Sequence, residues 1–388
     1  MKILYHHRTA SKDGQAVHIE EMVGALRALG NDVRVVAPSE VKDAGMGAEG
    51  GMVQRLRKYL PKGIYEILEL GYSLLAYVRL ARAAKEFKPD VIYERYNLFL
   101  LAGVMLKWRT GLPLLLEVNS PLAFERNQFG GLGMPWMARW AEAVAWRGAD
   151  FVLPVTNVLA NFIREKGVPD HRIFVIPNGI NEAHFLPSPS PEVARKRLDW
   201  SDSLILGFVG FVRDWHGVDR VVSWLAKPTS PRDAKLLVVG DGPARNDIEA
   251  LAKKLGISDR VRFTGFVPRD QVPVYVAGFD IALQPAVVPW ASPLKLFEYL
   301  ALGKAIIAPN SPNIGEVLRH EHNALLFDES QSASFEEMLA RLCADEDLRH
   351  RLGRSANETI GALGLTWNRN AQRVGELAKR HLATNVKA

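Results

Sequence analysis

The feature that most constrains the fold is an alternation of short apolar segments with longer amphipathic ones along the whole chain. The short segments are rich in Val, Ile and Leu, as buried strands are, and the longer ones carry apolar residues at helical spacing. Because parallel strands need helical crossovers, this order predicts a doubly wound α/β fold with parallel sheets. The predicted strands are residues 2–5, 32–36, 90–93, 113–118, 151–155, 174–176, 204–209, 236–239, 261–263, 281–283, 305–308 and 325–327.

A proline-rich stretch, residues 186–192, interrupts this alternation and reads as a hinge-like connector. The alternation then restarts, which predicts two Rossmann-like domains facing a cleft. We place the first domain at residues 1–183 and the second at 184–365. A last helix, within residues 366–388, is expected to pack back on the first domain.

Composition sets limits on the function. The 388 residues carry a net charge of +6, with 48% hydrophobic and 24% charged residues, which suits a soluble globular protein with an anionic partner. A single cysteine, Cys343, excludes a disulfide within the chain and a multi-cysteine metal site, and it fits a reducing cytoplasm. No apolar run is long enough to span a membrane. The basic residues are not interleaved with aromatic ones, which argues against nucleic acid as the partner.

Several other chemistries lack their motifs. The chain has no phosphate loop of the Gly-x4-Gly-Lys type, no His-Glu-x-x-His zinc helix and no Gly-x-Ser-x-Gly nucleophile elbow. We therefore expect no metal site.

The stretch from Trp290 to Ala308 offers the clearest candidate binding site. Ser292 is predicted to be a helix N-cap, with Pro293 at the first helical position. Lys295 and Glu298 lie three residues apart, on one face near the positive end of the helix. Such a helix start could hold a diphosphate and the ribose beside it. The alternative is a capped surface helix with an ordinary ion pair.

A second candidate is the glycine-bearing turn of residues 207–217. Arg213 is positioned to meet a phosphate, although it could instead pair with Asp214. His216 could contact a phosphate or be an ordinary residue at a helix start. The turn at residues 240–243 is a weaker signal, because turns of this composition are common. The loop at residues 261–268 leaves backbone amides for a nucleotide base.

Six motifs in order resemble the retaining glycosyltransferases of family 4, which have the GT-B fold. They are Pro177-Asn-Gly-Ile, Gly207-x-x-Gly210, Trp215-His-Gly-Val-Asp219, Val239-Gly-Asp-Gly-Pro243, Val261-x-Phe-x-Gly265 and Ser292-Pro-x-Lys-x-x-Glu-Tyr-x-Ala-x-Gly303. The resemblance spans the chain and is stronger in the second half. It implies a UDP- or GDP-sugar as donor substrate, bound mainly by the second domain, with no metal and no cofactor. It also implies transfer with retention of anomeric configuration.

The resemblance implies roles for several residues of the second half. Glu298 matches the second glutamate of the family's Glu-x7-Glu motif, which holds the donor ribose, whereas Trp290 stands where the first glutamate is expected. Backbone amides of residues 291–294 would then hold the sugar hydroxyls. Phe211 and His216 occupy positions where relatives carry Arg and Lys, and we expect Arg213 and Lys295 to restore the charge. The residues expected to bind the donor are Gly210, His216, Gly242, Gly265, Phe266, Ser292, Pro293, Leu294 and Glu298.

In the first half, Gly14 partly matches the glycine loop that approaches the donor phosphates. His18 could face the cleft or be a satisfied surface histidine. Asn119 stands where the family often has a histidine, and an amide can donate a hydrogen bond but cannot act as a base. This favours a front-face mechanism in which the leaving diphosphate takes the acceptor proton. Glu125 as the base is the rival assignment.

The acceptor is predicted less directly. Residues 54–62 are basic and lead into the apolar run 64–80; with Trp136, Met137, Trp140 and Trp146 this region could lie on anionic lipid. The alternative is an ordinary helix pair with a solvated face. A sugar or lipid-linked glycan acceptor, and a cytoplasmic location at the inner face of the membrane, are the resulting expectations.

Two other functions remain open at this point. One is a GT-B enzyme of different chemistry, such as a nucleotide-sugar epimerase. The other is a nucleotide-binding protein without catalysis, motivated by the basic charge.

Overall fold

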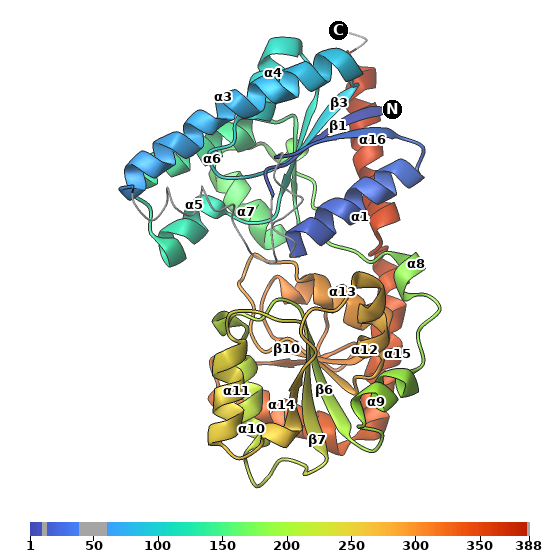
Figure 1. Cartoon of the computed structure of the whole chain (residues 1–388). Helices are drawn as coiled ribbons and strands as arrows, with labels where there is room; N and C mark the ends of the chain where they lie inside the picture. Colours follow the sequence, from blue (N-terminus) through green and yellow to red (C-terminus); the bar gives the residue numbers. More distant parts are fainter. Residues whose placement is uncertain (10–13, 39–59, 386–388) are drawn as a thin grey trace. The chain divides into compact units, whose positions relative to one another are not determined.

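A computed structural model describes residues 1–9, 14–38 and 60–385 and divides the chain into two compact units (Figure 1). Unit 1 comprises Met1–Pro177, Trp290–Ser292 and Trp367–Ala388, and unit 2 comprises Asn178–Pro289 and Pro293–Thr366. The chain therefore passes from unit 1 to unit 2 after Pro177. It returns to unit 1 for three residues at Trp290, and returns again after Thr366.

Unit 1 is built on a five-stranded sheet in the order β2-β1-β3-β4-β5. Its strands are β1 (Lys2–His6), β2 (Asp32–Val36), β3 (Val91–Arg95), β4 (Leu114–Val118) and β5 (Phe151–Pro154). Its helices are α1 (Gly14–Ala28), α3 (Lys62–Phe87), α4 (Ala102–Thr110), α5 (Leu122–Glu125), η1 (Arg126–Gly130), α6 (Pro135–Gly148), α7 (Asn157–Glu165), η2 (Asp170–Arg172) and α16 (Trp367–Asn385).

Unit 2 is built on a six-stranded sheet in the order β11-β10-β9-β6-β7-β8. Its strands are β6 (Leu204–Val209), β7 (Ala234–Val239), β8 (Val261–Phe263), β9 (Ile281–Leu283), β10 (Ala305–Pro309) and β11 (Leu325–Phe327). Its helices are α8 (Glu182–Phe185), α9 (Pro191–Leu198), η3 (Asp214–His216), α10 (Val218–Leu225), α11 (Arg245–Lys254), η4 (Ser258–Arg260), η5 (Arg269–Gln271), α12 (Val272–Ala277), α13 (Leu294–Ala301), η6 (Ile314–Glu316), α14 (Ser332–Ala344) and α15 (Glu346–Leu363).

All the strand pairs in both sheets are parallel, which confirms the predicted doubly wound α/β class. Two predicted elements differ from the structure. Residues 174–176 bond to β5 through the backbone N–H groups of Phe174 and Ile176 but form no full strand. The apolar pattern of residues 98–108 predicts a helix over that whole range, but the helix begins only at Ala102, because Phe99 adopts a φ of 65°, which is outside the helical region.

Strand order identifies where each sheet can bind a ligand. In unit 2, β6, β7 and β8 extend the sheet in one direction, and β9, β10 and β11 extend it in the other. The loops after β6 and β9 therefore diverge at a topological switch point, where open α/β sheets bind their ligands. In unit 1 the corresponding point lies between β1 and β3.

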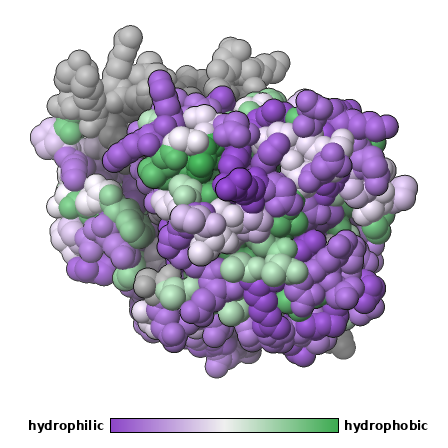
Figure 2. All heavy atoms as spheres, turned by 90° about the horizontal axis from the view of Figure 1, so that it is seen from below, coloured by the Kyte–Doolittle hydropathy of each residue, from purple (hydrophilic) through white to green (hydrophobic). Residues whose placement is uncertain are grey.

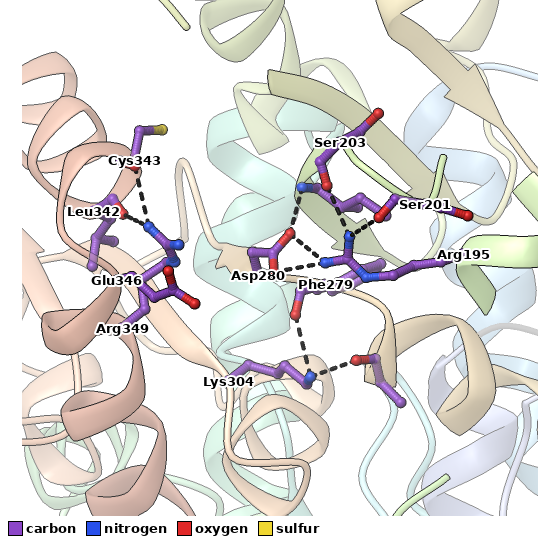
Figure 3. Close-up of polar contacts among 12 residues, drawn as sticks. Arg195, Ser201, Ser203, Phe279, Asp280, Lys304, Leu342, Cys343, Glu346 and Arg349 are labelled. Carbon is purple, nitrogen blue, oxygen red and sulfur yellow. Dashed lines mark hydrogen bonds and ion pairs between the residues drawn. The ribbon is translucent and has the colours of Figure 1, made fainter. Parts of the chain in front are cut away.

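At the opposite end of the unit 2 sheet, a polar network fixes the start of β9 (Figure 3). Arg195 of α9 donates two 2.7 Å hydrogen bonds to the carboxylate of Asp280, which also accepts the Ile205 N–H at 2.7 Å. Lys304, just before β10, donates to the carbonyls of Ala277 and Phe279. These bonds hold three neighbouring strands in register and leave the carboxyl ends of the strands to the site.

Candidate active site

The loop after β6 and the first turn of α13 bring together four residues that were predicted from sequence to bind the donor phosphates. Gly210 has a φ of 128°, a conformation that favours glycine. A Cβ added to Gly210 would lie 3.7 Å from Lys295 Nζ. His216 Nδ1 accepts the backbone N–H of Arg213 at 3.0 Å. We call Gly210, Arg213, His216 and Lys295 the phosphate cluster.

His216 is the neutral member of the phosphate cluster. Burial and, to a smaller extent, the nearby positive charges of Lys295 and Arg213 together lower the pKa of His216 to about 2. Since Nδ1 accepts a hydrogen bond, the ring proton of the neutral imidazole lies on Nε2. His216 therefore offers an uncharged N–H donor.

Lys295 is the titratable member. Its Nζ lies 3.7 Å from the centroid of the Phe208 ring. Burial lowers the pKa of Lys295 and the charge of Glu298 offsets this only partly, so that the pKa is about 7. The alternative interpretation, an ordinary ion pair between Lys295 and Glu298, is wrong, because Glu298 pairs with Arg269 instead. Lys295 thus keeps its ammonium for another anion.

Arg213 is exposed, and its guanidinium lies 5.1 Å from the Phe211 ring centroid. The alternative pairing of Arg213 with Asp214 is not formed. An exposed guanidinium beside a buried lysine and an imidazole N–H is suited to binding the oxygens of a diphosphate.

The glycines of the next loop act through backbone packing. A Cβ on Gly240 would lie 2.2 Å from the Gly210 carbonyl oxygen, and one on Gly242 would lie 2.1 Å from that of Val212. The Gly242 N–H donates to its neighbour Asp241, at 2.8 Å. Gly240 and Gly242 therefore let the loop after β7 pack directly on the backbone of the loop after β6, which carries most of the phosphate cluster.

The loop after β8 carries Gly265 and Phe266. Gly265 has a φ of 69°, and Phe266 is 67% exposed, so the loop presents its backbone and one ring to solvent. Thr264, which was not selected from the sequence as a site residue, accepts the Gly240 N–H at 3.1 Å and donates to the Gly265 carbonyl. It joins the two loops.

The start of α13 differs by one residue from the prediction. Pro293 is the N-cap and Leu294 is the first helical residue, so Ser292 lies just outside the helix. Ser292 and Trp290 belong to unit 1, where Trp290 packs against Phe124 and its carbonyl accepts the Thr156 hydroxyl at 3.0 Å. Trp290, which stands where the family's first glutamate is expected, is therefore a buried residue that packs within unit 1.

Glu298 is 5% exposed and forms an ion pair with Arg269 of η5. Arg269 was not predicted, and no sequence signal singles it out within a polar loop. One carboxylate oxygen of Glu298 binds Arg269, which fixes the orientation of the carboxylate and leaves the other oxygen to accept a hydroxyl.

In unit 1, the buried carboxylate of Glu117 at the end of β4 organises the neighbouring polar groups. It accepts Tyr93 Oη at 2.9 Å and Asn119 Nδ2 at 2.6 Å, pairs with Arg95, and lies 3.0 Å from His18 Nε2. Burial alone would raise the pKa of Glu117, but His18, Arg95 and these hydrogen bonds outweigh it and lower the pKa far below its usual range. Glu117 is thus a permanent anion that positions other groups.

This network changes the interpretation of three predicted residues. His18 is only 3% exposed and packs edge-on against Trp367, so the surface-histidine alternative is wrong. The Asn119 amide is oriented by Glu117, and Glu125 accepts the hydroxyl of Ser120. Gly14 is the first residue of α1; the loop before it lies outside the described residues.

Within the described residues no group of three or more His, Cys, Asp or Glu side chains is placed to hold a metal ion. Each helix there is too short or too polar to cross a bilayer.

Comparisons with known proteins agree with this architecture. Residues 13–179 match the family model "Glycosyl transferase 4-like domain", and residues 191–359 match "Glycosyl transferases group 1". A 2-deoxystreptamine glucosyltransferase of Streptomyces kanamyceticus is 35% identical over 38% of this chain and 39% of its own length. The lipopolysaccharide core biosynthesis glycosyltransferase LpsD of Rhizobium meliloti is 26% identical over 93% of both chains.

The aligned regions span 39% and 65% of the length of the first two curated relatives, the second being an alpha-D-kanosaminyltransferase of the same Streptomyces. Among solved structures, Anabaena HepE in complex with UDP has a TM-score of 0.76 at 18% identity, covering 98% of this chain and 100% of its own. Sucrose-phosphate synthase of Thermosynechococcus elongatus has the same TM-score at 20% identity, covering 99% and 100%. At such identities these likenesses show the fold alone.

The two family models together match most of the chain, and the two parallel-sheet units have the fold of these structures, so the protein belongs to the group 1 glycosyltransferases of family 4, with the GT-B fold.

Proposed function

We propose that this protein transfers a sugar from a UDP- or GDP-sugar to a hydroxyl acceptor, with retention of anomeric configuration and without a metal. The phosphate cluster is the observation that carries this proposal. It gathers a guanidinium, an ammonium and an imidazole N–H at a glycine turn, at the switch point of the unit 2 sheet.

The cluster suits the departure of a diphosphate. Negative charge develops on the diphosphate as the bond to the sugar breaks, and preorganised donors in a partly dry site stabilise that charge. Lys295 and Arg213 supply cations, and His216 supplies an N–H, so the protein itself provides the charge that a metal would otherwise bring. Glu298, held by Arg269, is proposed to bind the ribose hydroxyls.

For the transfer step we propose that the leaving diphosphate oxygen accepts the proton of the attacking acceptor hydroxyl. Asn119, oriented by Glu117, then positions the sugar and takes no proton. Glu125 as the base is the competing assignment, and its hydrogen bond from Ser120 is compatible with an ionised carboxylate. Glu117 is excluded as a base, because its low pKa and four partners keep it from accepting a proton.

The acceptor is proposed to be a sugar or lipid-linked glycan in polysaccharide or glycolipid synthesis. LpsD, which matches nearly the whole chain, is named for lipopolysaccharide core biosynthesis. We further propose that the protein works in the cytoplasm, at the inner face of the membrane.

Isothermal titration calorimetry with UDP, GDP and ADP tests the donor site. One diphosphate is expected to bind, and Lys295→Met is expected to weaken it by roughly tenfold, the loss of one charged hydrogen bond. Lys227→Met is the matched control, because Lys227 forms an ion pair with Glu336, away from the phosphate cluster.

Binding of none of the three diphosphates would contradict the donor site. If one diphosphate binds, incubation of the protein with the corresponding nucleotide sugar and no acceptor distinguishes an epimerase from a transferase. An epimerase changes the sugar under these conditions, and a transferase does not. Product anomers read by NMR test retention, and activity in the presence of EDTA tests independence from a metal.

A further inference from the structure

Helix α3, the long blue helix of unit 1 in Figure 1, buries carboxylates on one side and exposes large apolar side chains on the other. Its protein-facing side includes two glutamates. Glu66 accepts the backbone N–H groups of Gly133 and Met134 at 2.7 and 2.8 Å, and Glu69 pairs with Arg126 at 2.8 Å. Carboxylates that would normally face water are thus turned inward and satisfied.

The opposite face of α3 is aliphatic and exposed. It carries six large apolar side chains that are 49–62% exposed, namely Ile64, Ile67, Leu68, Leu74, Leu75 and Val78. Their spacings of three, four and seven residues put them on one face, about 21 Å long at a rise of 1.5 Å per residue. A contiguous apolar row on a surface indicates an interaction site. On the face shown in Figure 2, by contrast, hydrophobic residues form only small groups among hydrophilic ones.

The charges on this face are mainly basic. Between residues 64 and 85, every exposed position of α3 is apolar, glycine or basic, and the basic ones are Arg79, Arg82 and Lys85. The exposed carboxylate that follows, Glu86, forms an ion pair with Arg34. The row of aliphatic side chains therefore continues into two turns of cations. This arrangement complements a surface with an apolar interior and an anionic outer layer.

Aromatic side chains lie near the other end of the helix. Met134, the N-cap of α6, is bonded to Glu66, and its side chain lies against Gly63 at the start of α3. The next turns of α6 expose Trp136 by 64% and Trp140 by 50%, whereas Met137 and Trp146 are buried, so only the first two can belong to a surface. Tryptophan is enriched where a bilayer meets water.

We propose that the exposed face of α3 docks on the surface of an anionic lipid bilayer. The six aliphatic side chains enter the boundary between headgroups and acyl chains, and Arg79, Arg82 and Lys85 contact lipid phosphates. The same face of a second copy is a poorer partner for Arg79, Arg82 and Lys85, because its exposed carboxylate, Glu86, already pairs with Arg34. The docking is independent of sugar transfer.

Flotation of the full chain with phosphatidylcholine vesicles, with and without phosphatidylglycerol, tests the proposal. The wild-type protein is expected to float only with the anionic vesicles and to dissociate as salt is raised. Leu74→Glu/Leu75→Glu is expected to abolish flotation, and Arg79→Gln/Arg82→Gln to weaken it roughly thirtyfold at low salt. The matched control, Leu255→Glu/Leu363→Glu, changes two exposed leucines of unit 2 and should float like the wild type.

Far-UV circular dichroism and melting temperatures of the three variants check that they are folded. The proposal fails if the wild type does not float, or if Leu74→Glu/Leu75→Glu floats as well as the control. It also fails if the wild type sediments as a dimer that this variant converts to a monomer while neither floats, since the face then joins two copies of the chain.

Discussion

At the scale of single residues, the phosphate cluster holds two nitrogen bases whose pKa values are lowered to different extents. His216, with a pKa of about 2, stays neutral throughout the accessible pH range, whereas Lys295, with a pKa of about 7, is half protonated near neutrality. Since only protonated Lys295 attracts a diphosphate strongly, binding must raise its pKa. Nucleotide affinity is therefore linked to pH through one residue.

We expect the affinity for UDP to fall as pH rises above 7, by up to roughly tenfold per unit, and to be flat below 7 as far as Lys295 is concerned. Between pH 7 and 9 the diphosphate itself is almost fully ionised, because a terminal phosphate has a second pKa of about 6. Lys295→Arg keeps the charge without titrating near neutrality, so its affinity should not change between pH 7 and 9. Calorimetry at a series of pH values measures both slopes. Equal slopes for the two proteins would show that another group titrates.

A second prediction separates the ribose from the phosphates. Glu298→Gln should weaken UDP binding by roughly tenfold, because an amide accepts a hydroxyl less strongly than a carboxylate held by Arg269. Binding of inorganic pyrophosphate should not weaken, since it has no ribose. Competition between the two ligands measures both affinities, and a parallel loss of both would place Glu298 at the phosphates instead.

At the scale of elements, the apolar composition of the short segments was enough to predict the strands, because most of them are buried along their length, the edge strands β2 and β8 less so. Local rules failed where a tertiary partner decided the outcome. Glu298 and Lys295 have the spacing of a helical ion pair, yet Arg269, 29 residues before Glu298, takes the carboxylate. Likewise, Ser292 is a good N-cap residue, but Trp290–Ser292 belongs to unit 1 and the helix starts after Pro293.

Helix α3 is a second case in which distant partners decided what the local sequence could not. Its residues 64–80 read as an ordinary amphipathic helix, and composition alone cannot say which face is inside. The direction was set by Gly133, Met134 and Arg126, which satisfy Glu66 and Glu69 from a distant segment. Sequence therefore selected candidate residues of unit 2 one segment at a time, and missed the contacts between segments, such as those of Thr264 with Gly240 and of Arg269 with Glu298.

The two glycine loops of unit 2 pack so closely that a single methyl group tests their contact. Gly242→Ala would place Cβ 2.1 Å from the Val212 carbonyl oxygen, so the loops must separate. We expect a loss of about 2–3 kcal/mol in the free energy of unfolding and weaker UDP binding. Gly361→Ala, on α15 with no atom within 4 Å of the added Cβ, is the control and should be neutral or slightly stabilising. Denaturant titration measures both, and an unchanged stability of Gly242→Ala would contradict the close packing.

At the scale of the whole molecule, each unit has its own hydrophobic core. Unit 2 has one cluster that includes Phe279 and Tyr299, and another that includes Phe208 and Phe327. In unit 1, α16 packs on α1. The buried ring of Trp367 contacts His18, and Asn370 donates to the Pro177 carbonyl at 2.6 Å. The last helix of the chain is thus part of the structure of unit 1, although it follows unit 2 in sequence.

Separate cores predict separate unfolding transitions, and a different change should shift each of them. UDP binds unit 2 in our proposal. At a concentration one hundred times its Kd it should increase the free energy of unfolding of unit 2 by about 2.7 kcal/mol and so raise the temperature of one calorimetric transition. Trp367→Ala removes a large buried ring from unit 1 and should lower the other transition, at a cost of about 3–5 kcal/mol. The variant with UDP should show both shifts, each as large as when measured alone, because the two sites share no partner. Differential scanning calorimetry measures them, and one transition that moves with both changes would mean that the two units unfold as a single cooperative body.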